Sequence, residues 1–171
     1  MISMILAALA IAAPAAQDPL APARDGRVQC YSPDVERQVC RAIGAYRFEA
    51  DGRIFNDAEN MLDTEPLTIL RASYEVYVKD NAECVTGGLL ARYIQSIEVD
   101  GGALDAEALA SRASAIEAYW LSTIGPGEYC STYHPQPDGS LRAVVTVDGR
   151  LRESDNTILW VRREDGWRVA P

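Results

Sequence analysis

The chain has 171 residues, of which 48% are apolar and 24% are charged, and acids outnumber bases 25 to 16 for a net charge of −9. The apolar content excludes a disordered chain, and only 12 scattered glycines exclude a collagen-like one. The negative charge argues against nucleic acid as a partner, because an acidic protein repels phosphate. The length is typical of one domain with a stable core.

The N-terminal residues predict export. Residues 4–13 form an uninterrupted apolar run, and Ala13-Pro14-Ala15 supplies the small residues that signal peptidase requires. We therefore expect residues 1–16 to be a signal peptide, although no Lys or Arg precedes the run. The run is shorter than the roughly 20 residues that span a bilayer, so no transmembrane segment is expected after cleavage. Arg outnumbers Lys 15 to 1, which favours a bacterial periplasmic or secreted protein.

The cysteines agree with export, because an even number in an exported chain predicts disulfides. They are Cys30, Cys40, Cys84 and Cys130. No C-x-x-C is present, which argues against a redox motif and a zinc site. Pairing Cys30 with Cys40 and Cys84 with Cys130 is narrowly favoured, because the first bridge closes a short loop. The combination Cys30–Cys130 with Cys40–Cys84 is nearly as good.

The first half of the chain predicts a short helix followed by hairpins. Residues 17–29 contain two prolines and no periodicity, so we expect an extended leader. Ser32-Pro33-Asp34 supplies the residues that begin a helix, which predicts a helix over 33–42. Asp51-Gly52 then predicts a hairpin turn. In residues 72–79 apolar and polar side chains alternate, which predicts a strand.

The second half predicts one long helix between strands. Residues 94–99 are expected to be a strand ending at a turn. Asp105 is the expected N-cap of a helix over 106–123, which carries an apolar stripe at helical spacing. Residues 141–170 predict an antiparallel meander, because Asp-Gly pairs separate its apolar runs. Six glycines in all follow an aspartate, and such pairs are typical of hairpins: Gly26, Gly52, Gly101, Gly139, Gly149 and Gly166.

These elements together predict a single α+β domain over residues 30–171. One or two antiparallel sheets, of six or seven strands in all, are expected to pack on the helix at 106–123. A short N-terminal helix and two disulfides complete the expected structure.

No catalytic or cofactor-binding motif is present in the sequence, so we expect no cofactor, no metal and no catalytic residue. The single histidine, His134, follows Cys130 closely enough to suggest a nucleophile pair. A cysteine held in a disulfide is not a nucleophile, however, so we interpret His134 as a loop residue.

Carboxylates are the remaining candidates for chemistry. Residues 49–109 hold 13 acids and 4 bases, which accounts for a charge of −9. Five of these acids lie close together: Asp51, Asp57, Glu59, Asp63 and Glu65. They could hold a cation or act as an acid–base pair, but their spacing does not match an EF-hand loop. A solvated polar surface is the simpler interpretation.

The last residues, Ile158-Leu-Trp-Val-Arg-Arg-Glu-Asp-Gly-Trp-Arg-Val, resemble the final hairpin of some NTF2-like domains. The resemblance implies a cone-shaped fold around a pocket, as in small enzymes and ligand carriers. It covers about 12 residues, and early hairpins stand where NTF2-like domains have long N-terminal helices. No catalytic residue is carried over.

Two functions follow as hypotheses. The first is a non-catalytic envelope protein that binds a protein or a small ligand through its sheet or its acidic surface. The alternative is a small NTF2-like enzyme or ligand carrier. An apolar pocket with a carboxyl group of raised pKa would favour the alternative.

Overall fold

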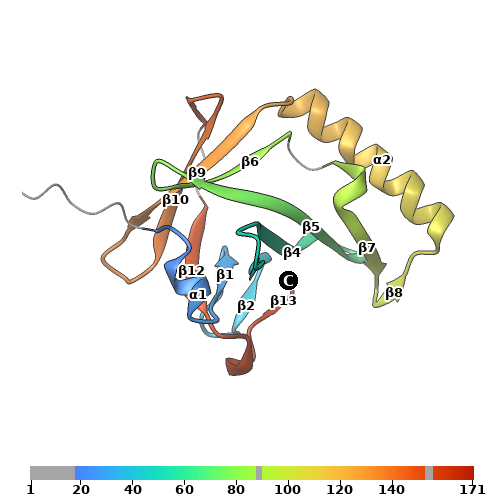
Figure 1. The fold of residues 1–171 in the computed structure, drawn as a ribbon. Helices are drawn as coiled ribbons and strands as arrows, with labels where there is room; N and C mark the ends of the chain where they lie inside the picture. Colours follow the sequence, from blue (N-terminus) through green and yellow to red (C-terminus); the bar gives the residue numbers. More distant parts are fainter. Residues whose placement is uncertain (1–17, 88–89, 153–155) are drawn as a thin grey trace, which may run out of the picture.

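The structure, a computed structural model, describes residues 18–87, 90–152 and 156–171. The predicted signal peptide, residues 1–16, lies outside these ranges. The described chain is mostly β, and its main feature is a closed antiparallel barrel of eight strands (Figure 1). Around the barrel the strands follow the order β4-β3-β1-β12-β10-β9-β6-β5, and pairing between β5 and β4 closes the ring. The bounds of these strands are β1 Val28–Tyr31, β3 Ala42–Phe48, β4 Ile54–Thr64, β5 Leu67–Lys79, β6 Ala82–Thr86, β9 Glu128–Pro135, β10 Leu141–Val147 and β12 Thr157–Val161.

Further strands extend the barrel at its edges. One end of β5 projects beyond the ring and pairs with β7, which in turn pairs with β8. β11 pairs with β10, and β2 pairs in parallel with β13 as a separate two-stranded sheet. The bounds of these strands are β2 Val39–Cys40, β7 Ile94–Val99, β8 Gly102–Ala103, β11 Arg150–Arg152 and β13 Arg168–Val169.

Helices are few. α1 (Ala21–Arg24) is one turn, and two short 3-10 helices, η1 and η2, occupy Ala91–Tyr93 and Arg163–Asp165. The long helix α2 (Ala106–Thr123) runs beside β7 and the projecting end of β5 (Figure 1). Glu117 ties α2 to η1 by accepting a hydrogen bond from the backbone N–H of Ala91 at 3.2 Å.

The predicted α+β class is wrong, because the sheet packs mainly on itself and not on a helix. Asp-Gly pairs indicate where the chain turns, and all six of the glycines noted above have a positive φ. They do not indicate which distant strands meet. Closure depends on such pairings: β1 lies between β3 and β12, whose residues are far apart in sequence. The strands of the closed ring enclose its interior themselves, and α2 packs beside β7 and the projecting end of β5.

The predicted helix over 33–42 is also wrong. Asp34 and Val39 instead exchange two backbone hydrogen bonds, of 2.9 and 3.1 Å, across a tight turn. Gln38 in that turn has a φ of +52°, which a helix does not allow. The Cys30–Cys40 disulfide brings residue 40 back beside β1, with 5.4 Å between the two Cα atoms. The tertiary bridge therefore outweighs the local helix signals of Ser32-Pro33-Asp34.

Two smaller expectations differ from the structure at the termini. Residues 17–29, expected to be an extended leader, include α1 and the start of β1, and Leu20 is fully buried. The segment at 167–170 does not continue the C-terminal meander, because β13 pairs with β2 and not with β12. The final hairpin that resembled NTF2-like domains is therefore not formed.

Other expectations are confirmed. α2 spans Ala106–Thr123, and the Asp105 carboxylate accepts a hydrogen bond from the N–H of Ala108 at 2.9 Å. β5 and β7 include the predicted strands at 72–79 and 94–99. The narrowly favoured cysteine pairing is also the one present.

Alternation along the strands divides the side chains between two environments. On the outside of β1 and β3, a cluster that includes Cys30, Ile43, Val161 and Trp167 is buried under β2 and β13. The opposite faces of the same strands point into the barrel. There Gly44 of β3 lies between its two cross-strand partners, Gln29 of β1 and Ala58 of β4.

Candidate functional site

A polar network occupies the barrel interior, which is unusual because buried polar groups are costly unless they are hydrogen-bonded. Gln29 on β1, Asn56 on β4 and Glu83 on β6 are all buried. Tyr46 on β3 and Tyr133 on β9 reach them from other sides of the barrel. Side chains from strands on different sides of the barrel can contact one another only across its interior.

Glu83 is at the centre of this network. Its Oε2 accepts hydrogen bonds from the hydroxyls of Tyr46, at 2.7 Å, and of Tyr133. Its Oε1 lies 3.5 Å from the Nδ2 of Asn56, which donates. Gln29 Oε1 lies within hydrogen-bonding distance of the hydroxyls of Tyr31 and Tyr46, at 2.6 and 2.7 Å. The network therefore joins five strands of the barrel.

Burial shifts the pKa values in this network. Loss of water raises the pKa of Glu83, and the hydrogen bonds from Tyr133, Tyr46 and Asn56 oppose that rise only in part. Burial and the nearby Glu83 also raise the pKa values of Tyr31, Tyr46 and Tyr133. The neutral forms of these groups are therefore favoured inside the barrel.

A pocket opens beside the network at one mouth of the barrel. We call its two adjoining parts the polar lobe and the apolar lobe; they share Asn60, Met61, Tyr74 and Trp120. The polar lobe has a volume of about 360 Å³. Its wall includes Asn56, so this residue connects the pocket with Glu83. Small residues leave this space open, because Gly44 and Ala58 also line the lobe.

The apolar lobe lies between the barrel and α2. Its volume is about 410 Å³, and Leu70, Val85 and Ile116 contribute to its wall. Trp120 of α2 packs against Tyr129 of β9, with 5.9 Å between the ring centroids. α2 thus acts as a cover over the mouth of the barrel.

Three buried polar atoms in this region have no hydrogen-bond partner among the described residues. They are Asn56 Oδ1, Gln29 Nε2 and Trp120 Nε1. Asn56 and Trp120 both line the polar lobe. A buried polar atom left unpaired costs about 1–3 kcal/mol, so a bound polar group or an ordered water would be stabilised here.

The acidic residues predicted as a candidate cation surface lie outside this pocket. Asp57 and Glu59 occupy the outer positions of β4, which alternate with the inward Asn56, Ala58 and Asn60. Each outer acid is paired with an arginine: Asp57 with Arg47 at 3.3 Å, and Glu59 with Arg163 at 2.6 Å.

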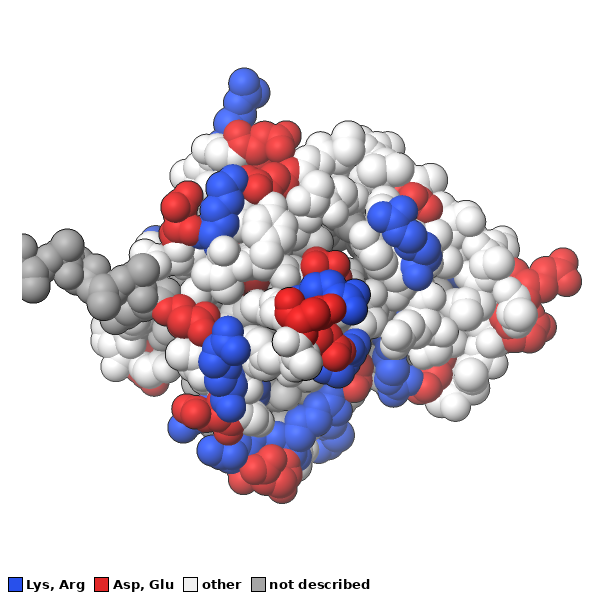
Figure 2. Space-filling model, viewed as in Figure 1, with Lys and Arg blue, Asp and Glu red and all other residues white. Residues whose placement is uncertain are grey.

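The other three predicted acids lie near the ends of β4. Asp51 pairs with Arg53 at 2.8 Å, and the hydrogen bonds from Arg53 hold its pKa below the usual value. Asp63 accepts the backbone N–H of Thr64 at 2.8 Å, and Glu65 is exposed. Within the described ranges, no three side chains of the metal-ligating types lie close enough to hold an ion. Figure 2 shows acids and bases interspersed on one face, so charge there is largely balanced locally.

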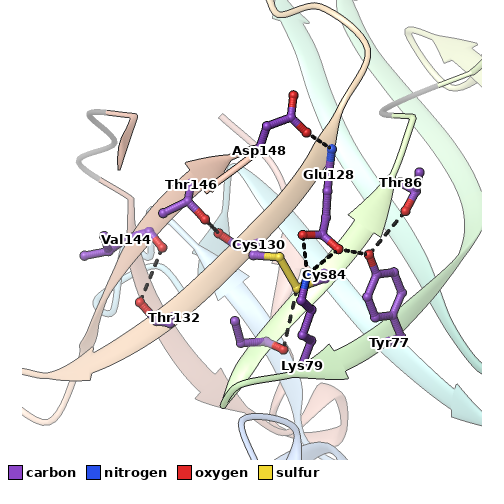
Figure 3. The surroundings of a disulfide bond; sticks show 11 residues. Tyr77, Lys79, Cys84, Thr86, Glu128, Cys130, Thr132, Val144, Thr146 and Asp148 are labelled. Carbon is purple, nitrogen blue, oxygen red and sulfur yellow. Dashed lines mark hydrogen bonds and ion pairs between the residues drawn. A yellow bond between two sulfur atoms is a disulfide. The ribbon is translucent and has the colours of Figure 1, made fainter. Parts of the chain in front are cut away.

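The Cys84–Cys130 disulfide joins directly opposed residues of β6 and β9 (Figure 3). Beside it, Glu128 accepts hydrogen bonds from Lys79, at 2.7 Å, and from Tyr77, at 2.6 Å. His134 is exposed on β9 and contacts Thr132 at 3.0 Å.

The interior network was not predicted from the sequence. One signal was available in the composition, which includes 8 tyrosines against 2 phenylalanines. Another was the inward position of Tyr74 in the predicted strand. Glu83 had no distinguishing signal, because it was one of the 13 acids between residues 49 and 109. Only the barrel shows that this acid is buried.

None of the helices in the described parts of the chain is long and apolar enough to cross a membrane. No protein-family model matches the chain, and neither a curated protein nor a solved structure matches it.

Proposed function

We propose that this protein is an exported binding protein of the bacterial envelope that holds a small ligand in the pocket at the barrel mouth. The observation that carries the proposal is the pocket itself, with an apolar lobe under α2 and a polar lobe with two unpaired buried atoms. Pockets of a few hundred Å³ that combine apolar walls with a few polar groups are typical of small-molecule sites.

Export is supported by two features that are independent of the pocket. Two disulfides persist best in an oxidising compartment. The apolar run at residues 4–13, with its small-residue cleavage site, is typical of an export signal. We therefore place the protein in the periplasm or outside the cell.

Binding is favoured over catalysis by the position of Glu83. A carboxyl with a raised pKa is a candidate general acid, but Glu83 is not among the residues that line the pocket. It contacts the pocket wall through Asn56. Its role in the proposal is to position Asn56 and the tyrosines, which makes the site a rigid receptor.

The test is a fluorescence titration with N-phenylnaphthylamine, a neutral apolar probe that brightens in apolar pockets. We expect saturable binding at one site per chain. Asn60→Trp should abolish it, because Asn60 lines both lobes and a tryptophan there would fill their junction. Thr64→Trp is the matched control, since this residue is exposed on the same strand. Equal binding by Asn60→Trp and the control, with both folded by circular dichroism, would contradict the proposal.

A further inference from the structure

We infer that the ligand is an amphipathic anion, with an acidic head in the polar lobe near Arg41 and a single apolar chain in the lobe beneath α2. This inference rests on the proposed function and specifies its ligand. It depends on the charge, the hydrogen-bond donors and the apolar surface that the two lobes present.

The charge of the lining differs from that of the protein. The whole chain has a net charge of −9, yet Arg41 is the one charged side chain among the described residues that line the two lobes. Its backbone is fixed at the rim, because its N–H donates to Tyr31 O at 2.9 Å and its C=O accepts from Met61 N–H at 3.0 Å. No ion pair joins Arg41 to another residue within the described ranges. An arginine placed in this way suits a carboxylate or a phosphate, which it binds with two parallel hydrogen bonds.

The unpaired donor at the junction of the lobes also favours an acceptor. Trp120 Nε1 is buried and has no partner in the described part of the chain, and an indole N–H only donates. Trp120 lines both lobes, so this buried N–H belongs to the wall where a head and a chain would meet. An anionic or neutral oxygen can accept this hydrogen bond, whereas an ammonium head cannot.

The apolar lobe requires the other half of the ligand. Leu62, Leu70, Val85 and Ile116 contribute to its wall, and no acid or base lines it within the described ranges. A charge placed there would lose its water without compensation, whereas an alkyl chain would be stabilised by burial. The two lobes therefore select for opposite ends of one molecule.

Glu83 does not line the polar lobe. Its carboxyl lies behind Asn56 and accepts hydrogen bonds from Tyr46 and Tyr133. Burial also raises its pKa.

Isothermal titration calorimetry of the mature, oxidised protein tests the inference, with each amphiphile kept below its micelle concentration. We expect decanoate or decyl phosphate to bind at least about tenfold more tightly than decanol, which is the ratio that one charge-assisted hydrogen bond supplies. The anion that binds more tightly, decanoate or decyl phosphate, indicates whether the head group is a carboxylate or a phosphate. Decyltrimethylammonium should bind more weakly than decanol, and butyrate should not bind, because its chain is too short to fill the apolar lobe.

Arg41→Gln should weaken decanoate binding about tenfold and leave decanol binding unchanged. Arg27→Gln is the matched control, because this exposed arginine lies at the opposite end of β1 from the pocket residue Tyr31. Decanol binding as tight as decanoate, or equal losses in the two variants, would overturn the anionic ligand and leave the proposed pocket intact. Failure of N-phenylnaphthylamine and of every amphiphile to bind would overturn both.

Discussion

At the scale of single residues, the barrel contains a carboxyl group, Glu83, that has no ion pair with any described residue. Glu83 accepts hydrogen bonds from two tyrosines and an asparagine, none of which is charged. Ionising such a group costs free energy that the hydrogen bonds only partly return. The network is therefore most stable when Glu83 is protonated.

The stability of the protein should therefore depend on pH through Glu83. The folded protein holds the Glu83 proton above the usual pKa of 4.5, whereas the unfolded chain releases it near that value. The folded state thus binds more protons, and this contribution to stability is lost as pH rises from 4.5 through the folded pKa. Urea denaturation between about pH 4 and pH 8 should show that the wild type loses stability relative to Glu83→Gln as pH rises.

The wild type must be compared with Glu83→Gln, because several acids at the surface change the stability with pH in the opposite direction. Hydrogen bonds and ion pairs lower the pKa values of Asp51, Glu128 and Asp138. Their contribution is lost as pH falls, and it cancels in the difference between wild type and variant. Glu36→Gln, which removes an exposed acid, is the matched control for the loss of one carboxyl group. A difference between the wild type and Glu83→Gln that stays constant with pH would disprove a buried, proton-binding carboxyl.

At the scale of elements, α2 combines strong local signals with a narrow contact surface. Its many alanines and the Asp105 cap favour helix without any partner. Ala113 is its only buried residue, and Leu109, Ile116 and Trp120 are partly buried. The C-terminal half holds the pocket residues, whereas the N-terminal turn depends on its cap.

We expect Asp105→Ala to destabilise the protein by about 1 kcal/mol, because the N–H of Ala108 loses its side-chain acceptor. The measurement is the urea midpoint at neutral pH. Asp105→Asn should retain most of the stability, since an amide oxygen also caps. Fraying should stay in the first turn, so N-phenylnaphthylamine binding at the other end of the helix should be unchanged. A loss of probe binding in Asp105→Ala would show instead that α2 forms or unfolds as one unit.

At the scale of the whole molecule, the two disulfides constrain the unfolded chain differently. Cys30–Cys40 spans 10 residues and joins β1 to β2. Cys84–Cys130 spans 46 residues and joins two neighbouring strands of the barrel. A longer loop loses more entropy when it is closed, so the second bridge restricts the unfolded state more strongly.

We expect replacing the pair Cys84 and Cys130 by alanine to cost about 4 kcal/mol and replacing Cys30 and Cys40 to cost about 3 kcal/mol, from loop closure alone. Thermal and urea unfolding of the two double variants would measure this order. The reduced wild type should be less stable than either double variant. The reverse order would show that burial of Cys30 and Cys40 in the outer core outweighs the loop length.

The sequence by itself determined the local features of this protein. Asp105 and the alanines specified α2, the Asp-Gly pairs specified turns, and alternation specified which side chains of β5 share a face. These features depend on interactions between near neighbours in the chain, which a pattern of residues can report. The same patterns placed Asp57 and Glu59 together, and both lie on the outside of the barrel, each paired with an arginine.

Only the tertiary structure decided that the sheet closes and what it encloses. The pairings of β1 with β12 and of β6 with β9 join residues distant in sequence, and no local pattern encodes such partners. The same is true of the interior, because a lone glutamate such as Glu83 is buried only once strands surround it. The local helix signal at 33–42 failed for the related reason that a disulfide and a long-range sheet held those residues elsewhere. Long-range contacts thus created the pocket, whereas the sequence supplied the turns that made the barrel possible.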